Sequence, residues 1–219
     1  MQLEKFNEQK AKFHEQEKAV LAIQTELDKA KNILEALKNE KAEFVARQKE
    51  KLAEVGTLSA DEYVELKNKN SGLDARIEYY QAILVDLENK LYDEKEEMFS
   101  IQAEAKRIRS HIFIEQAEQL FSEIMEENQA KLAEIWACLE HSGTINPTQY
   151  TGNATQSDLI LHHLVEKFKS AMPKEGNISE EYKLYSSTLT GFTPKSPLAK
   201  QKEDRMEKPK GLSALINEM

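Results

Sequence analysis

Apolar residues recur every seven positions along the first part of this 219-residue chain. Phe6 begins one series. Each residue of a second series, which includes Ile23, lies three residues after a position of the first. Together they comprise Phe6, Phe13, Val20, Leu27 and Leu34, with Ile23, Ala30, Leu37 and Phe44. This spacing is typical of a helix packed lengthwise on another helix. At about 1.5 Å per residue such a helix extends roughly 65–75 Å, so the pattern predicts a coiled-coil rod rather than part of a compact globule.

A break follows at Gly56, which suits the left-handed end of a helix. Ser59 and Glu62 then have the spacing of a capping box, which predicts a second helix from about Ala60. Its apolar seam comprises Tyr63, Leu66, Leu73, Ile77, Tyr80, Leu84, Leu87, Leu91 and Met98, and it continues through Ile101, Ala105, Ile108 and Ile112. The short connection between two long amphipathic helices predicts an antiparallel hairpin.

Neither glycine nor proline occurs between Gly72 and Gly143. A straight helix over that span would exceed about 100 Å, so we expect a bend or a short turn within it. From Ile112 to Leu139 the apolar face widens, which favours packing on more than one neighbour. Cys138 lies beside Trp136 and Leu139, and we expect it to be a small buried hydrophobe; a reactive thiol is the alternative.

The helix-breaking residues Gly143, Pro147 and Gly152 end the long helical region. A further helix is predicted from about Ser157 or Asp158 to Met172. Its expected apolar face is Leu161, Leu164, Val165 and Phe168. The prolines, glycines and charges that follow indicate an extended arm. The predicted fold is all-α: a coiled-coil hairpin (1–112), a smaller helical region (113–190) and an extended charged C-terminal arm (191–219).

Charge is distributed unevenly along the chain, whose formal net charge is −9. Residues 56–140 carry 19 acidic and 9 basic side chains, so nucleic-acid binding driven by phosphate contacts is not expected. The mildly basic arm is either solvated or directed at an acidic protein surface. No apolar run approaches the roughly 18 residues of a membrane span, and the single cysteine suits a reducing compartment. We therefore expect a cytoplasmic protein without membrane contact.

The residues that carry chemistry are not arranged for catalysis. There is no glycine-rich phosphate loop, nucleophile elbow or Cys/His metal spacing. His162 and His163 are adjacent, so on a helix they diverge by about 100° and cannot share a metal. We expect no enzyme, no catalytic residue, no metal and no cofactor.

A basic cluster, Lys106, Arg107 and Arg109, interrupts the acidic second helix. These residues flank the seam rather than occupy it. In one interpretation they form interhelical ion pairs, each contributing about 0.2–1 kcal/mol. In the other they mark a surface that a partner contacts.

The order of elements resembles the polarity suppression proteins of satellite phages. The sequence IRSH at residues 108–111 is similar to a tetrad at the corresponding place in that family. Gly191, Phe192 and Pro194 resemble its Gly-Phe-x-Pro segment, and the stretch that contains Asp204 and Arg205 resembles an acidic–Arg–Glu–Lys pattern. Most of the chain follows the family's layout, although the residue matches are short.

The resemblance implies an intertwined homodimer around a long coiled coil. It further implies that the chain binds the hexameric transcription terminator Rho and thereby blocks Rho's RNA-dependent ATP hydrolysis, so that termination fails. It also implies decoration of a phage capsid. The implied locations are the cytoplasm of a bacterial host and the virion surface. Partner-binding candidates are Gly191, Phe192, Pro194, Arg205, Glu207, Lys208, Arg107 and Arg109. The alternatives are a capsid scaffold or decoration protein without action on transcription, and a generic coiled-coil adaptor.

Overall fold

The computed structural model describes residues 2–53, 59–145, 154–173, 176–205 and 211–212. Its helices are α1 (Gln2–Ala53), α2 (Ala60–His141), α3 (Gln156–Ala171) and α4 (Pro197–Asp204), with single 3₁₀ turns at Glu180–Tyr182 and Ser187–Leu189. These described residues contain no β-strand, so the all-α prediction is confirmed. Helix α4 lies in the arm, where only a closing turn near residues 212–216 was expected.

The chain divides into two compact units. The hairpin unit comprises Leu3–Lys106 and Leu184–Met219, and the middle unit comprises Arg107–Lys183. Helix α2 supplies the second arm of the hairpin and also the first helix of the middle unit. The C-terminal segment therefore belongs to the same unit as α1.

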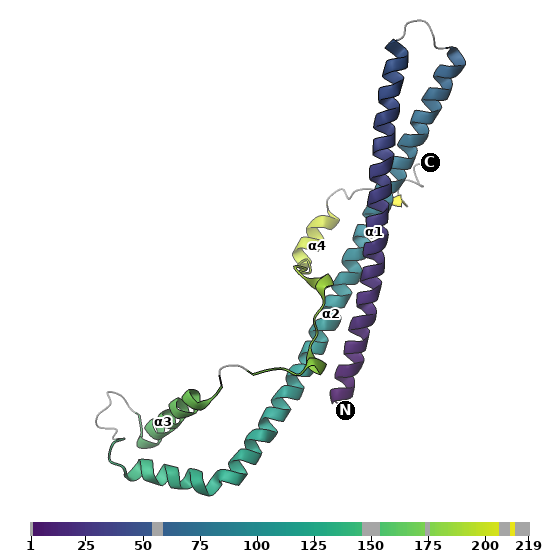
Figure 1. The fold of residues 1–219 in the computed structure, drawn as a ribbon. Coiled ribbons are helices and arrows are strands. Elements are labelled where there is room, and N and C mark those ends of the chain that lie inside the picture. Colours follow the sequence, from purple (N-terminus) through teal and green to yellow (C-terminus); the bar gives the residue numbers. More distant parts are fainter. Residues whose placement is uncertain (1, 54–58, 146–153, 174–175, 206–210, 213–219) are drawn as a thin grey trace. The chain divides into compact units, whose positions relative to one another are not determined.

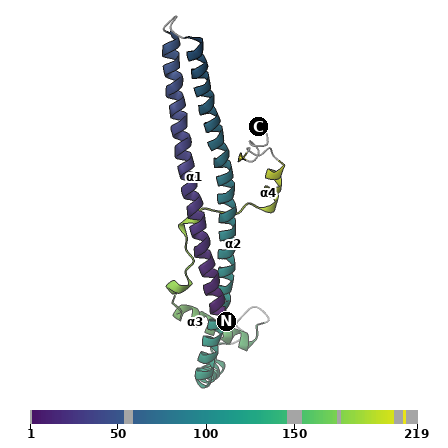
Figure 2. The ribbon, with the colours of Figure 1, turned by 90° about the vertical axis from the view of Figure 1, so that its right-hand side faces the viewer.

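Within the hairpin unit, α1 and α2 lie side by side and run antiparallel (Figures 1 and 2). Contacts between the helices follow this direction: Gln16 binds Glu94, Lys31 lies 3.6 Å from Glu88, Lys41 pairs with Asp74, and Gln48 donates to the carbonyl of Leu66. As the residue number rises in α1, that of its partner falls in α2. The predicted hairpin pairing is confirmed.

The buried side chains of α1 recur at the seven-residue spacing. Phe6 and Phe13 are fully buried, and every seam residue predicted up to Leu34 is buried: Phe6, Phe13, Val20, Ile23, Leu27, Ala30 and Leu34. On α2, Leu73 and Leu91 are buried. Four further predicted residues of that helix are also buried: Met98, Ala105, Ile108 and Ile112. The others are only half-buried, namely Leu66, Ile77, Tyr80, Leu84, Leu87 and Ile101, except Tyr63, which is exposed against the prediction because it lies near the start of α2. The core is thus best closed where the N-terminal half of α1 lies.

The start of α2 matches the capping prediction. The backbone N–H of Ser59 donates to the Glu62 carboxylate at 2.8 Å, and the N–H of Glu62 donates back to the Ser59 hydroxyl at 3.3 Å. Gly56 lies outside the described residues. From Ala60 to His141 the helix is uninterrupted, so the short turn that was one expectation is absent; instead the ribbon bends in its C-terminal part (Figure 1).

The middle unit departs from the prediction of a wide buried face. Phe121 is 64% exposed and Ile124 is 56% exposed, and other apolar side chains of this stretch are also exposed: Ile114, Leu120, Met125 and Ile135. Cys138 is exposed rather than buried. Ile112 is buried at the start of this face, and Leu132, Trp136 and Leu139 are half-buried, so the face is covered only in part.

Helix α3 also exposes apolar side chains that were predicted to be buried. Of its predicted face, Leu164 is half-buried, while Leu161, Val165 and Phe168 are exposed. The buried residue is Ile160. The middle unit therefore presents apolar side chains from both α2 and α3.

A capping box fixes the first turn of α3. The hydroxyl and backbone N–H of Thr155 donate to the Asp158 carboxylate at 2.7 and 2.9 Å. These hydrogen bonds lower the pKa of Asp158 from its ordinary 3.8 because they favour the ionised form, the side-chain bond most. The cap therefore stabilises α3 above pH 3.8, and its contribution is lost as the pH falls through the lowered pKa.

Replacing Thr155 with valine raises the pKa of Asp158 toward 3.8, because the hydroxyl donor is lost while the backbone donor remains. A carbon-detected NMR titration of the Asp158 carboxyl measures this shift. An unchanged pKa in the variant would contradict the assigned cause. Glu166, whose pKa is lowered by its hydrogen bond to Lys169, serves as the internal control and keeps its value.

Candidate functional site

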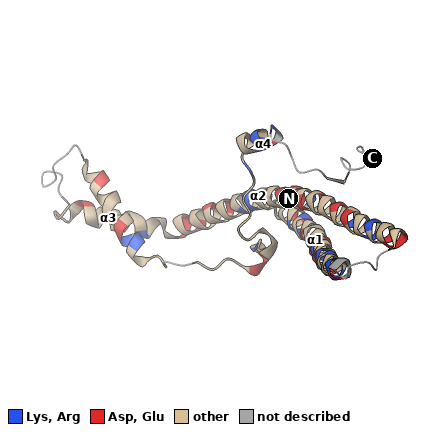
Figure 3. Cartoon of the chain, turned by 90° about the horizontal axis from the view of Figure 1, so that it is seen from above, with Lys and Arg blue, Asp and Glu red and all other residues tan. Residues whose placement is uncertain are grey.

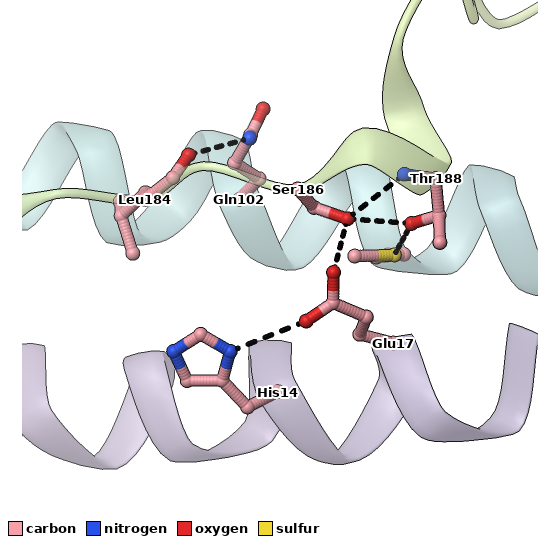
Figure 4. A network of polar contacts seen from close by, with 7 residues as sticks. His14, Glu17, Gln102, Leu184, Ser186 and Thr188 are labelled. Carbon is pink, nitrogen blue, oxygen red and sulfur yellow. Dashed lines mark hydrogen bonds and ion pairs between the residues drawn. The ribbon is translucent and has the colours of Figure 1, made fainter. Parts of the chain in front are cut away.

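Residues 184–205, here called the strap, lie along the hairpin. Figure 4 shows the first anchor, where the buried Ser186 donates a hydrogen bond to the Glu17 carboxylate of α1. The Ser186 hydroxyl also contacts the Thr188 hydroxyl at 2.6 Å and accepts the N–H of Thr188 at 3.2 Å. His14 Nδ1 lies 3.4 Å from the other Glu17 oxygen. One carboxylate of α1 thus holds the strap through a buried hydroxyl.

The strap also contacts α2 at this anchor. The Thr188 hydroxyl donates to the sulfur of the buried Met98 at 3.4 Å, and Gln102 donates to the carbonyl of Leu184 at 3.1 Å (Figure 4). The strap therefore contacts α1 and α2 together. It forms a third layer over the part of the hairpin where the seam is most buried.

An aromatic contact forms the second anchor. Gly191 has a φ of +74°, a left-handed conformation that side-chain-bearing residues rarely adopt. The turn is followed by Phe192, whose ring centroid lies 5.7 Å from that of Tyr92 and 6.3 Å from that of Phe99. The glycine at this position thus permits the turn that places the phenylalanine on α2.

Lysines hold the rest of the strap. The ammonium group of Lys195 lies 4.7 Å from the centroid of the Tyr92 ring, and the Lys195 backbone N–H donates to the Tyr92 hydroxyl at 2.8 Å. Lys200 of α4 binds Glu96 at 2.5 Å, and this hydrogen bond raises the pKa of Lys200 above its ordinary 10.5. The stability that this lysine–glutamate pair contributes through Lys200 is fully present below pH 10.5 and is lost only as the pH rises through the raised pKa. At neutral pH the Lys200 side chain is therefore charged and binds Glu96.

The basic cluster has contacts of its own. Arg109 donates to the backbone carbonyl of Tyr182 at 2.9 Å, within the middle unit, and the Tyr182 ring stacks edge-on with Phe113 at 4.9 Å. Lys106 donates to Gln102 one turn earlier at 2.8 Å. The Arg109 contact is one that neither interpretation of the cluster considered: this arginine fastens a later segment of the same chain.

The partner-binding candidates occupy different environments. Phe192 and Pro194 are half-buried on the hairpin, whereas Gly191 and Arg205 are exposed. In the middle unit Arg107 is exposed and Arg109 is half-buried. Glu207 and Lys208 lie outside the described residues. Sequence reasoning singled out Phe192 but missed its receptor, Tyr92 with Phe99, because no local pattern links residues a hundred positions apart.

Replacing Phe192 with alanine loosens the strap. Loss of two aromatic contacts costs about 2 kcal/mol locally, which corresponds to roughly 30-fold faster amide exchange over the strap. Hydrogen exchange measured by mass spectrometry reports this change, with the protection of α1 retained. Leu198→Ala is the matched control, because Leu198 is 63% exposed on α4. Equal exchange in both variants would show that Phe192 is not an anchor.

Among the described residues, no group of three or more His, Cys, Asp or Glu side chains is placed to hold a metal ion. No described helix combines the length and the apolar character needed to cross a bilayer. Comparisons with protein-family models, with curated proteins and with solved structures found no match to this chain.

Proposed function

We propose that this chain inhibits Rho-dependent transcription termination by binding the Rho hexamer, and that it has a second role as a phage capsid decoration protein. The observation that carries the proposal is the placement of the two segments that resemble polarity suppression proteins. The first, residues 108–111, supplies Arg109, which binds the Tyr182 backbone. The second, around Phe192, packs on α2. Each segment is held by specific contacts within the chain, which fix its position for a partner.

Action by binding fits the chemistry of the chain. Figure 3 shows Lys and Arg interspersed with Asp and Glu along α1 and α2, a pattern suited to protein contacts and not to a phosphate backbone. Phe192 already rests on Tyr92, so a partner that uses this ring either meets it on α2 or displaces it. No direct nucleic-acid contact is part of the proposal.

The proposed active form is a homodimer. Exposed apolar side chains on α2 and α3 of the middle unit, Phe121 and Phe168 among them, favour a contact with a second copy. Two copies present two identical binding surfaces to a ring of identical subunits, and bivalent attachment raises avidity without new contacts. The proposed locations are the bacterial cytoplasm and the virion surface.

The test combines binding with transcription. Purified chain immobilised on beads retains Rho, and adding the chain to an in vitro reaction increases read-through at a Rho-dependent terminator. An intrinsic terminator on the same template is the control and keeps its efficiency. A chain ending at Thr190 lacks Phe192 and α4, so it retains its helicity but binds Rho more weakly. Absence of Rho binding together with unchanged read-through would reject the proposal.

The second candidate is a capsid scaffold or decoration protein without action on transcription. A long hairpin, and a middle unit with exposed apolar side chains, also suit attachment to a shell of repeated subunits. In that case the chain co-purifies with particles and leaves both terminators unchanged. The two-terminator experiment therefore separates the candidates.

A further inference from the structure

A change in the seam occurs beyond Leu34 of α1. The seven-residue series Phe6, Phe13, Val20, Leu27, Leu34 continues to Lys41 and Gln48, which are polar. Lys41 pairs with Asp74 of α2, and Gln48 donates to the carbonyl of Leu66. Leu37 and Phe44 of the second series remain half-buried, whereas the apolar residues Ala42, Val45 and Ala46 of α1 lie to one side of this line.

These displaced residues form a groove of about 580 Å³ on the hairpin. Its floor is Ala42, Val45 and Ala46 of α1 with Ile77 of α2. Val45 and Ile77 are half-buried, and the two alanines are exposed. The strap anchors described above lie elsewhere, at Glu17 and along α2 from Tyr92 to Gln102, so among the described residues this half of the hairpin lacks the third layer.

Two lysines stand at the ends of the groove. Lys38 and Lys49 both line it, and positions eleven apart on a helix lie on nearly the same face, separated by about 16 Å. Both side chains are exposed, and within the described part of the chain neither has a carboxylate partner. Lys41, the third lysine of the groove, is already neutralised by Asp74. The groove thus offers a short apolar floor, from Ala42 to Ala46 on α1, and about one turn beyond each end lies a lysine that has no carboxylate partner among the described residues.

We propose that this lysine groove binds an amphipathic helix of a partner protein, with an apolar stripe on the floor and a carboxylate facing each lysine. A third helix that packs lengthwise on two paired helices buries the apolar surface that the pair leaves exposed. An RNA or DNA strand is disfavoured because the floor has no aromatic ring for stacking and the chain is net acidic.

The chain's own C-terminal segment is a poor occupant. The backbone N–H of Leu212 donates to Asp86 of α2 at 2.9 Å. Asp86 is nine positions from Ile77, about half a turn away around the helix, so Leu212 lies on the other side of α2 from the groove. A separate helix is therefore the occupant.

The probe is a synthetic helical peptide with glutamates eleven residues apart and leucines at the fourth, seventh and eighth positions after the first glutamate. This pattern mirrors Lys38, Ala42, Val45, Ala46 and Lys49. Fluorescence anisotropy with the full chain at low salt measures its affinity. The glutamate peptide binds at least about tenfold more tightly than a matched peptide with lysines in place of the glutamates, and the preference shrinks at high salt because screening weakens the ion pairs.

Matched variants locate the site. Lys38→Glu with Lys49→Glu reverses the preference between the two peptides, and Ala46→Asp weakens both. Lys18→Glu with Lys29→Glu is the control: these exposed lysines also lie eleven apart on α1, outside the groove, and the preference persists. All replaced side chains are exposed, so the fold is retained.

Equal binding of the two peptides, or an unchanged preference after Lys38→Glu with Lys49→Glu, would overturn the proposal. A change in solution mass caused by the same double variant would also overturn it, because the occupant would then be a second copy. The assay contains no Rho, so its outcome is independent of the proposed function.

Discussion

Replacing Ile23 with aspartate lowers the free energy of unfolding of the helical hairpin by about 4 kcal/mol. Ile23 is 5% exposed in the middle of the buried part of the seam. The replacement removes apolar contacts and places a carboxylate where neither water nor a cation can compensate it, and both losses are among the largest that a single substitution produces. Urea unfolding followed by circular dichroism measures the change.

The matched control for this prediction is Leu21→Asp. Leu21 lies two positions away on α1 and is 49% exposed, so its aspartate stays hydrated and the cost is below about 1 kcal/mol. The destabilisation caused by Leu84→Asp is intermediate between these two values, because Leu84 is half-buried. Equal destabilisation by Ile23→Asp and Leu21→Asp would contradict the assigned seam.

Replacing Phe121 and Ile124 with glutamate raises the dissociation constant of the proposed homodimer by about a hundredfold or more. Both side chains are more than half exposed in the single chain. Their apolar surface is stabilising only when a second copy covers it, at about 25 cal/mol per Å², and two carboxylates in such an interface add an electrostatic penalty. Analytical ultracentrifugation over a concentration series measures the shift from dimer to monomer.

Ala130→Glu is the control for self-association. Ala130 is exposed and lies nine positions from Phe121, about half a turn away around the helix. This variant keeps the parent dissociation constant. A parent chain that is monomeric at all concentrations, or a double variant that associates as the parent does, would reject the dimer contact.

Local periodicity was enough to predict the hairpin. Because Phe6 to Leu34 repeat every seven residues, their side chains share one face, and only a partner helix of similar length can bury that face. Ser59 and Glu62 fix the start of α2 through contacts three residues apart, which a sequence displays directly. The all-α class, the two long helices and the buried residues of α1 follow from such local rules.

What the sequence could not supply was the identity of each neighbour. The apolar faces of α2 near Phe121 and of α3 near Phe168 were recognised, yet their exposure depends on which other element reaches them. Cys138 was expected to be buried for the same reason, and it is exposed. A pattern states which side of a helix is apolar and not what covers it.

The strap shows a second limit. Its anchors join Ser186 to Glu17 and Phe192 to Tyr92, pairs that are distant in sequence and have no shared period. Gly191 was noticed only as part of a short motif; the left-handed turn that it permits became clear from its φ angle. Long-range single contacts of this kind require the fold to be known first.

The measurement that most directly tests the central claim, action on Rho by binding, is the rate of RNA-dependent ATP hydrolysis by purified Rho titrated with this chain. Inhibition that rises with the concentration of the chain and saturates, and that weakens for the chain ending at Thr190, is the predicted result. A hydrolysis rate that stays constant up to a large molar excess of folded chain would contradict it.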